Sequence, residues 1–326
     1  MRMTADLTDL ISRGELDARG LSSRAIAASV RAGRLHKLHS GWYIDGETWR
    51  AAHVEQRHRY RVLAAYARSR DGVGVASLVS AAVMWDLPLF RITPRRVHQS
   101  GSTLDGHVST GDVARHEVDV SEGERVLIDG IPTTSLARTV ADMSRLATPE
   151  AGLSIADAAL RRVAWDPATR TYDHVAAEEL REAVRASMER VRGARGVRRG
   201  RRIVALADGR AQLPGESVSR LYLLELGFAP PRLQVPIPDP VGGWYFVDFG
   251  LDDVNSWGEF DGVGKYLDAR MRGGVDLERT LLAEKAREDW IRGTTNRKFP
   301  RWGMPALDSA RTLGIRLAHF HVVPPR

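Results

Sequence analysis

The feature that most limits the fold of this chain is a group of acidic residues inside strand-like segments of its last third. Residues 244–250 form a β-rich run in which Asp248 is the one charge. A second run, residues 257–262, carries Glu259 and Asp261 two positions apart, so both side chains project from one face of a strand. A charge inside a buried strand is costly unless it is paired or bound to a metal. The fold must therefore supply partners for these carboxylates.

Glu216 adds a further carboxylate, in the first turn of a helix that is predicted to follow Pro214. Acids brought together by two adjacent strands and a nearby helix repel one another. A hard divalent cation such as Mg²⁺ would remove this repulsion and leave coordination positions for water and a substrate phosphate. The alternative is that the acids lie in turns and at a sheet edge, paired with Arg220 or Arg287. The sequence leaves both interpretations open.

Positive charge is concentrated in one segment and consists almost wholly of arginine. The chain has a formal net charge of +7 and only four lysines, and residues 181–202 hold nine arginines and two acids. Such a segment can neutralise phosphates and release counterions, which favours a nucleic acid as partner. The alternative is a solvated linker helix whose arginines face water.

Residues 1–50 have the order of elements that is typical of a winged helix-turn-helix. Helical spacing over residues 7–11 and a brief helical piece at 16–18 precede a helix capped by Ser22 or Ser23, and two strand-like runs flank a Ser40-Gly41 turn. In this arrangement the capped helix lies in the major groove and the wing contacts phosphates or the minor groove. The residues expected to face DNA are Ser23, Arg24, Ala28 and Arg31 on the helix and Lys37 and His39 on the wing. A helical domain that binds a protein through the same face is the alternative.

Residues 51–174 are expected to form a mixed α/β stretch. Periodicity predicts helices over 58–69, 75–84, 134–144 and 155–163, and strands over 96–99, 117–120 and 125–128. His98, His107 and His116 lack metal-ligand spacing, so we expect no catalytic site in this region. A basic helix over 175–192 leads into a Gly/Arg run that ends at 202, which is the best candidate for a domain boundary.

The order of motifs in the last third matches a known group. It consists of a helix-borne Glu216, a strand Asp248, the Glu259-Phe-Asp-Gly motif, and the segments Asp261-Gly-Val-Gly-Lys-Tyr and Glu284-Lys-Ala-Arg-Glu-Asp-Trp-Ile-Arg. This layout resembles the very-short-patch-repair-like endonuclease branch of the PD-(D/E)XK nuclease superfamily. Actinobacterial proteins of that branch join the nuclease-like domain to an N-terminal winged helix similar to that of the AbiEi antitoxins of type IV toxin–antitoxin systems.

Motifs in the middle of the chain extend this resemblance over most of its length. They are Ser80-Ala-Ala with Leu87-Pro, Gly130-Ile-Pro-Thr-Thr-Ser-Leu-Ala-Arg-Thr-Val-Ala-Asp, and Asp157-Ala-Ala-Leu-Arg. The resemblance implies that Glu216, Asp248 and Glu259 hold Mg²⁺, or Mn²⁺ in its place. Asp261 stands where the superfamily has its signature lysine, and Lys265 is expected to bring a substitute ammonium to the attacking water or the scissile phosphate.

A helix predicted over residues 277–290 completes the expected site. We expect it to bury Leu281, Leu282 and Trp290 and to offer cationic side chains to DNA phosphates. Those side chains are Lys285, Arg287 and Arg292, and the alternative for Lys285 is an ion pair with Asp289 four residues on.

Several kinds of chemistry are excluded. The chain has no cysteine, which rules out thiolate nucleophiles, and it has no Gly-x-Ser-x-Gly elbow, His-Glu-x-x-His helix or complete phosphate loop, so no organic cofactor is expected. We also expect no secretory signal, no contact with a membrane and a cytoplasmic location.

These observations predict an α+β protein in four parts. They are a winged helix-turn-helix (1–50), a mixed α/β middle domain similar to AbiEi (51–174), a basic helical linker (175–202) and a restriction-endonuclease-like αβ domain (203–326). The expected function is binding of double-stranded DNA with Mg²⁺-dependent hydrolysis of its phosphodiesters. The alternative is a bacterial antitoxin or transcriptional repressor without catalysis, which binds its own operator and has a cognate toxin or its operon as partner.

Overall fold

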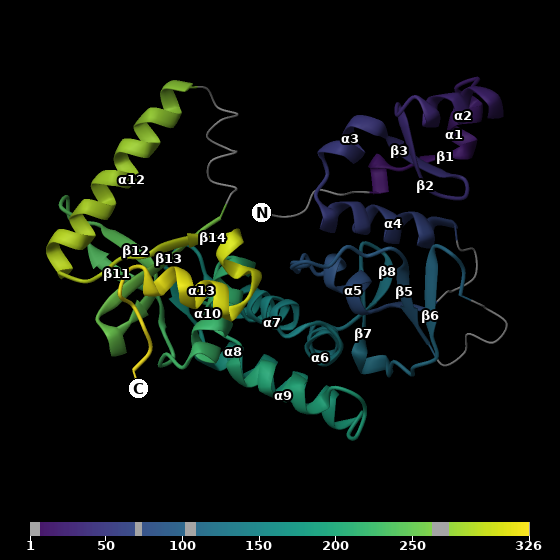
Figure 1. Cartoon of the computed structure of the whole chain (residues 1–326). Coiled ribbons are helices and arrows are strands. Elements are labelled where there is room, and N and C mark those ends of the chain that lie inside the picture. The colour runs from purple at the N-terminus through teal and green to yellow at the C-terminus, as the bar shows by residue number, and fades with distance from the viewer. Residues whose placement is uncertain (1–6, 69–73, 102–108, 263–273, 326) are drawn as a thin grey trace. The chain divides into compact units, whose positions relative to one another are not determined.

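The structure is a computed structural model that describes residues 7–68, 74–101, 109–262 and 274–325 (Figure 1). The contacts within the chain divide it into two compact units. The first unit consists of residues 1–155 and 178–205, and the second consists of residues 156–177 and 206–326. Helices and separate sheets occur in both, as expected for an α+β protein. None of the helices in the described ranges combines the length and the apolar character needed to cross a bilayer.

The first unit begins with a small three-stranded antiparallel sheet of order β1-β3-β2 and two short helices. Its elements are η1 (Leu7–Asp9), β1 (Ile11–Ser12), α1 (Arg13–Ala18), α2 (Ser23–Arg31), β2 (Leu35–His39) and β3 (Trp42–Asp45). Ser22 is the N-cap of α2, and its hydroxyl accepts a hydrogen bond from the Ala25 N–H. Leu16, Ile26 and Tyr43 form the core beneath α2. The predicted capped helix and hairpin are therefore present.

The helix expected over residues 7–11 is wrong. Those residues form a 3-10 turn and then strand β1, in which Ile11 pairs with Tyr43. Ser12 ends the strand because its side chain and that of Glu15 form a capping box that starts α1. The cap and the strand pairing together outweigh the helical spacing of the leucines.

A mixed five-stranded sheet of order β6-β5-β4-β8-β7 follows α3 (Gly46–Ala51) and α4 (Val54–Arg68). The other elements of this part are β4 (Val75–Ala76), α5 (Leu78–Met84), β5 (Val97–Ser100), β6 (Val113–His116), η2 (Glu122–Glu124), β7 (Arg125–Ile128), β8 (Ile131–Thr134) and α6 (Leu136–Leu146). Asp129 and Gly130 both have positive φ, as the predicted turn requires. The strand expected at 117–120 lies instead at 113–116, where β6 pairs with β5 in parallel. The helix expected over 75–84 begins only at Leu78, because Val75 and Ala76 form strand β4.

Helices α7 (Pro149–Ala164), α8 (His174–Glu189) and α9 (Val197–Leu206) and the strand pair β9 (Trp165–Asp166) and β10 (Thr171–Tyr172) connect these elements to the last third. The Gly/Arg run forms a turn after α8 and then continues as α9. Residues 178–205 pack with the first unit.

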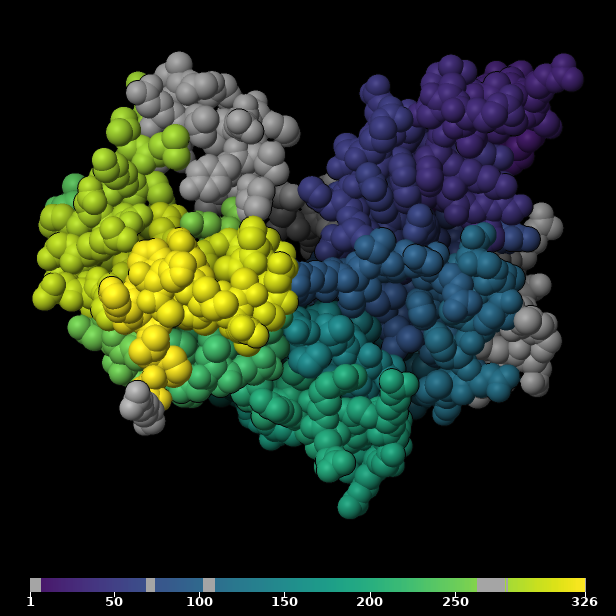
Figure 2. All heavy atoms as spheres, viewed as in Figure 1, coloured from purple at the N-terminus to yellow at the C-terminus, as the bar shows by residue number. Residues whose placement is uncertain are grey.

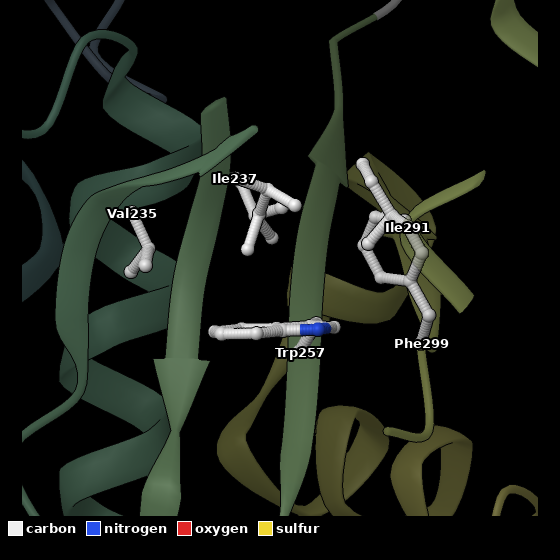
Figure 3. Close-up of a cluster of buried hydrophobic side chains, with 6 residues drawn as sticks. Val235, Ile237, Trp257, Ile291 and Phe299 are labelled. Carbon is white, nitrogen blue, oxygen red and sulfur yellow. The ribbon is translucent and has the colours of Figure 1, made fainter. Parts of the chain in front are cut away.

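The second unit contains a four-stranded sheet of order β11-β12-β13-β14, in which β14 runs parallel to β13 and the other pairs are antiparallel. Its elements are α10 (Pro214–Leu226), β11 (Arg232–Pro238), β12 (Trp244–Leu251), η3 (Asp252–Val254), β13 (Ser256–Asp261), α12 (Gly274–Thr295), β14 (Arg301–Gly303), η4 (Met304–Asp308) and α13 (Ala310–Ala318). Apolar side chains from the sheet and from α12 form the core shown in Figure 3, which includes Val235, Trp257 and Ile291. A Cβ on Gly215 would lie 2.1 Å from the ring of Phe260, so only glycine lets α10 approach the sheet this closely. This approach brings the next residue, Glu216, to the sheet.

Candidate functional site

Gln234 on β11 joins two of the predicted site carboxylates. Its Nε2 donates to Asp248 Oδ1 at 3.2 Å and to Glu216 Oε2 at 3.3 Å, and its Oε1 accepts a hydrogen bond from Gln212 Nε2 at 2.7 Å. Gln234 has a φ of +50°, a conformation that costs energy for a residue other than glycine. The fold therefore brings Glu216 and Asp248 to one amide.

Both carboxylates are held by further donors. The backbone N–H of Phe260 donates to Asp248 Oδ2 at 2.9 Å, and that of Gln212 donates to Glu216 Oε2 at 2.9 Å. Burial lowers the pKa of the Arg161 guanidinium, and the nearby charge of Glu216 opposes that shift. The cost of burying Glu216, which is 3% exposed, is thus offset by hydrogen bonds and by an arginine.

Glu259 pairs with an arginine. It is 4% exposed on β13, and the guanidinium of Arg287 on α12 lies 2.9 Å from its Oε1 and 3.1 Å from its Oε2. Arg287 also donates to the Phe246 carbonyl at 2.7 Å. Burial alone would lower the pKa of Arg287, but its hydrogen bond to Glu259 and the charge of that residue raise it above the usual value. The alternative prediction, in which Arg287 pairs with one of these acids, is confirmed for Glu259.

Asp261 pairs with Arg301 on the neighbouring parallel strand β14. Arg301 Nη2 lies 2.6 Å from Asp261 Oδ1 and 2.9 Å from Glu284 Oε1, and Arg301 Nη1 lies 3.2 Å from Glu288 Oε2. Burial works to lower the pKa of Arg301, and the hydrogen bond to Asp261 together with the charges of Glu259, Asp261 and Glu284 raises it. Arg220, the other arginine proposed as a partner, instead forms a buried pair with Asp157 at 2.8 Å.

This arrangement does not fit a metal site. A divalent cation needs several oxygen ligands around one point, and within the described ranges no group of three or more His, Asp or Glu side chains could hold one. Both oxygens of Glu259 face Arg287, so a guanidinium supplies the positive charge that was expected from Mg²⁺. Lys265, the predicted substitute for the signature lysine, lies outside the described residues.

The predicted phosphate contacts of α12 have different environments. Lys285 is exposed, Arg292 is exposed and pairs with Glu288 at 2.9 Å, and Arg287 is engaged by Glu259. The expectation that this helix buries Leu281, Leu282 and Trp290 is wrong, since these side chains are 47%, 61% and 37% exposed. Ile291, one position beyond Trp290, is fully buried and packs in the core of the second unit.

A second candidate surface lies on α2 and the β2–β3 hairpin of the first unit. Ser23, Arg24 and Arg31 are exposed on α2, Ala28 is partly exposed, and Lys37 is exposed on β2. Arg13 donates to the Ser23 hydroxyl at 3.0 Å and pairs with Asp17, which ties α1 to the start of α2. The exposed polar side chains of α2 and β2 thus contrast with the apolar core that Leu16, Ile26 and Tyr43 form.

The structure does not support a phosphate contact by His39. This residue is buried, and its Nδ1 accepts a hydrogen bond from the Ser40 N–H at 2.7 Å. An irregularity in the pairing of β2 with β3 between Lys37 and His39 changes the alternation of side chains and turns the ring inward. Burial, followed by the charge of Arg68, lowers the pKa of His39 and favours the neutral ring.

Sequence reasoning missed Gln234 and Arg301, which organise the carboxylates. Gln234 stands between the apolar residues Leu233 and Val235. A polar residue at that point of an apolar strand was the feature of the sequence that could have indicated its role. The sequence around Arg301 gave no comparable signal, because its partners lie up to 42 positions earlier in the chain, as Glu259 does.

Comparison with known proteins gives two relatives. No family model matches the chain. Uncharacterized protein MT2308 of Mycobacterium tuberculosis strain CDC 1551 / Oshkosh and Uncharacterized protein Rv2248 of strain H37Rv are each 30% identical to it over 136 residues. The match covers 42% of this chain and 45% of each relative, so the chain matches less than half the length of either protein.

Proposed function

We propose that this protein is a DNA-binding transcriptional regulator that acts in the bacterial cytoplasm and represses its own operon, as an antitoxin-like repressor does. In this proposal α2 enters the major groove of double-stranded DNA and the β2–β3 hairpin contacts the backbone. The observation that carries it is the two-sided character of α2. Ile26 packs against Leu16 and Tyr43 on one side, and Arg24 and Arg31 are exposed on the other.

The charges on this surface suit contact with DNA. Among the described residues, Arg24, Arg31 and Lys37 have no carboxylate partner, so their charges are available to phosphates or to base edges. The helix is also anchored, because the Ser22 cap, the apolar core and the contact of Arg13 with Ser23 all fix its first turn. A helix held in this way loses little conformational entropy when it binds.

In this proposal the carboxylates of the second unit are structural. Arg287 and Arg301 connect β13 and β14 to α12 through Glu259, Asp261 and Glu284. Ion pairs of this kind hold a helix on a sheet without any catalytic step. The expected nuclease-like domain thus serves as a non-catalytic scaffold. A cognate toxin is the partner protein that it would bind.

The experiment is a measurement of DNA binding by the variant Arg24→Ala/Arg31→Ala. The probe is a labelled duplex from the region upstream of the gene, and the control is Arg185→Ala/Arg311→Ala, which removes two exposed arginines elsewhere. We expect at least a tenfold loss of affinity for the first variant and less than a twofold loss for the control. Equal binding by parent and Arg24→Ala/Arg31→Ala would contradict the proposal.

The second candidate function is the endonuclease that the resemblance implies. It is favoured by one observation, namely that Glu216, Asp248 and Glu259 lie on α10 and on the adjacent strands β12 and β13. The test is nicking of supercoiled plasmid in Mg²⁺ or Mn²⁺ by the parent and by Asp248→Asn. Metal-dependent nicking that Asp248→Asn loses would establish this function. No nicking by the parent in either metal would remove it.

A further inference from the structure

The turn that joins α8 to α9 forms a hollow lined by four arginines. The hollow has a volume of about 470 Å³, and the arginines are Arg192, Arg198, Arg199 and Arg201. Figure 1 shows the turn at the ends of the two helices, and the atoms of this part of the chain are at the surface in Figure 2. We call residues 192–201 the arginine turn.

Positive charge in the arginine turn exceeds the negative charge that faces it. Arg201 pairs with Glu189, and Arg199 donates to the carbonyl of Arg145. Arg192 and Arg198 are exposed, and neither has a carboxylate partner among the residues that the structure describes. Guanidinium groups gathered around one hollow repel one another, and a bound anion would remove that repulsion.

The backbone of the arginine turn is held against α6 of the same unit. Gly196 has a φ of +82°, and a Cβ there would lie 2.0 Å from the carbonyl oxygen of Arg145. Arg145 in turn donates to the Arg195 carbonyl at 3.3 Å and pairs with Asp142 at 3.0 Å. Gly200 is less tightly enclosed, since the nearest atom to a Cβ there would be the end of the Met188 side chain at 2.9 Å. The arginines therefore project from a fixed turn rather than from a flexible linker.

We propose that the arginine turn is a phosphate-binding site and that it holds a backbone phosphate of nucleic acid. Arginine suits this role because its planar guanidinium donates two parallel hydrogen bonds to phosphate oxygens. The site would be a second contact with DNA besides α2, so this inference rests on the proposed function. The same chemistry would also bind a free phosphate compound, and the experiment distinguishes the two sources.

The experiment compares the parent, Arg192→Ala/Arg198→Ala, Arg24→Ala/Arg31→Ala and the control Arg185→Ala/Arg311→Ala. Arg185 on α8 is exposed, like the substituted arginines, but is paired with Glu178 at 2.6 Å. It therefore controls for the loss of an exposed arginine that is not expected to bind phosphate. Anisotropy of a labelled duplex is measured from 50 to 200 mM salt. Thermal unfolding of each variant checks that the fold is intact, which we expect because the substituted side chains are exposed.

The expected result is a change in the salt dependence of binding. The slope of log K against log[salt] should fall by about 0.9 for each lost phosphate contact. Arg192→Ala/Arg198→Ala should thus show a shallower slope and at least fivefold weaker binding than the control. Loss of binding by this variant alone would support the arginine turn and contradict the role of α2. Loss by Arg24→Ala/Arg31→Ala alone would overturn the nucleic-acid contact at the arginine turn and leave the proposed function standing.

Calorimetry with inorganic pyrophosphate, without DNA, tests the free-phosphate source. Heat of binding that Arg192→Ala/Arg198→Ala loses, together with unchanged DNA binding by that variant, would make the site one for free phosphate compounds. If that variant matches the control with both DNA and pyrophosphate, the proposal of a phosphate site is overturned.

Discussion

Arg287 and Glu259 form a buried two-pronged ion pair, in which the two Nη atoms of the arginine lie 2.9 and 3.1 Å from different oxygens of the carboxylate. The pair joins α12 to β13, and it is one of the two arginine pairings that the sequence offered as the alternative to a metal site. It also accounts for a carboxylate inside a buried strand without a metal ion, since a guanidinium can satisfy both oxygens.

The first prediction concerns this pair. Arg287→Met should destabilise the second unit by about 3–5 kcal/mol, because it leaves Glu259 buried without its counter-charge. Arg292→Met is the matched control on the same helix, and it should cost less than about 1 kcal/mol because Arg292 is about half exposed. Urea unfolding measures both. Adding Glu259→Gln to Arg287→Met should recover part of the loss, and equal stability of the two single variants would contradict the role assigned to the pair.

The second prediction concerns the acid stability of the first unit. Burial lowers the pKa of His58 to about 3 and that of His98 to about 4, in the latter case with help from the charge of His116. Both pKa values lie below the unfolded value, so the folded state binds fewer protons, and stability is lost as pH falls from about 6.5 toward 4. The slope should approach about 1.4 kcal/mol per pH unit for each histidine.

The check is the free energy of unfolding from pH 7.5 to 4.5 for the parent and for His98→Asn. The variant removes one of the histidines that take up a proton on unfolding, so its stability should fall less steeply over this range. A slope identical to that of the parent would mean that His98 is not a titrating group with a depressed pKa.

The third prediction concerns the core beneath α2. Ile26 is 2% exposed and packs against Leu16 and Tyr43. Ile26→Ala should cost about 2–5 kcal/mol and Ile26→Val about 0.5–1.5 kcal/mol, since the loss grows with the cavity that is left. If α2 reads DNA, the affinity for DNA should fall in the same order. Unchanged binding by a destabilised Ile26→Ala would separate DNA binding from this helix.

The fourth prediction uses two glycines of the arginine turn as a matched pair. Gly193 and Gly196 have φ values of +87° and +82°, so alanine is strained at both positions. At Gly196 the added Cβ would also meet the Arg145 carbonyl, whereas no atom lies within 4 Å of a Cβ at Gly193. Gly196→Ala should therefore reduce the salt slope of DNA binding, and Gly193→Ala should leave it close to that of the parent. Equal slopes for the two variants would argue against a fixed arginine turn.

Local signals in the sequence predicted the local parts of the structure. The cap at Ser22, the Asp129-Gly130 turn and the apolar run of β12 each depend on residues that are neighbours in the chain. Long-range contacts were not predictable in the same way. The inward position of His39 follows from an irregularity in strand pairing, and the partners of Arg301 are brought near it only when β14 joins the sheet.

The candidate site illustrates the same limit. The sequence pattern correctly put Glu216 on a helix and Asp248 and Glu259 on adjacent strands. It could not distinguish a shared cation from separate partners, because that depends on Gln234 and Arg287, which lie on other elements. The sequence therefore indicates where the negative charge of these carboxylates must be balanced. The structure is needed to identify the groups that balance it.

The most direct test of DNA reading by α2 uses the absence of cysteine from the sequence. Ser23→Cys creates a unique thiol on α2, to which a cleaving iron chelate can be attached, and Arg311→Cys gives a control position on α13. Each conjugate is bound to the region upstream of the gene, and DNA strand scission is mapped. The account predicts localised scission from the Ser23→Cys probe and only background scission from the Arg311→Cys probe. Background scission from both probes on bound DNA would contradict the claim that α2 reads the duplex.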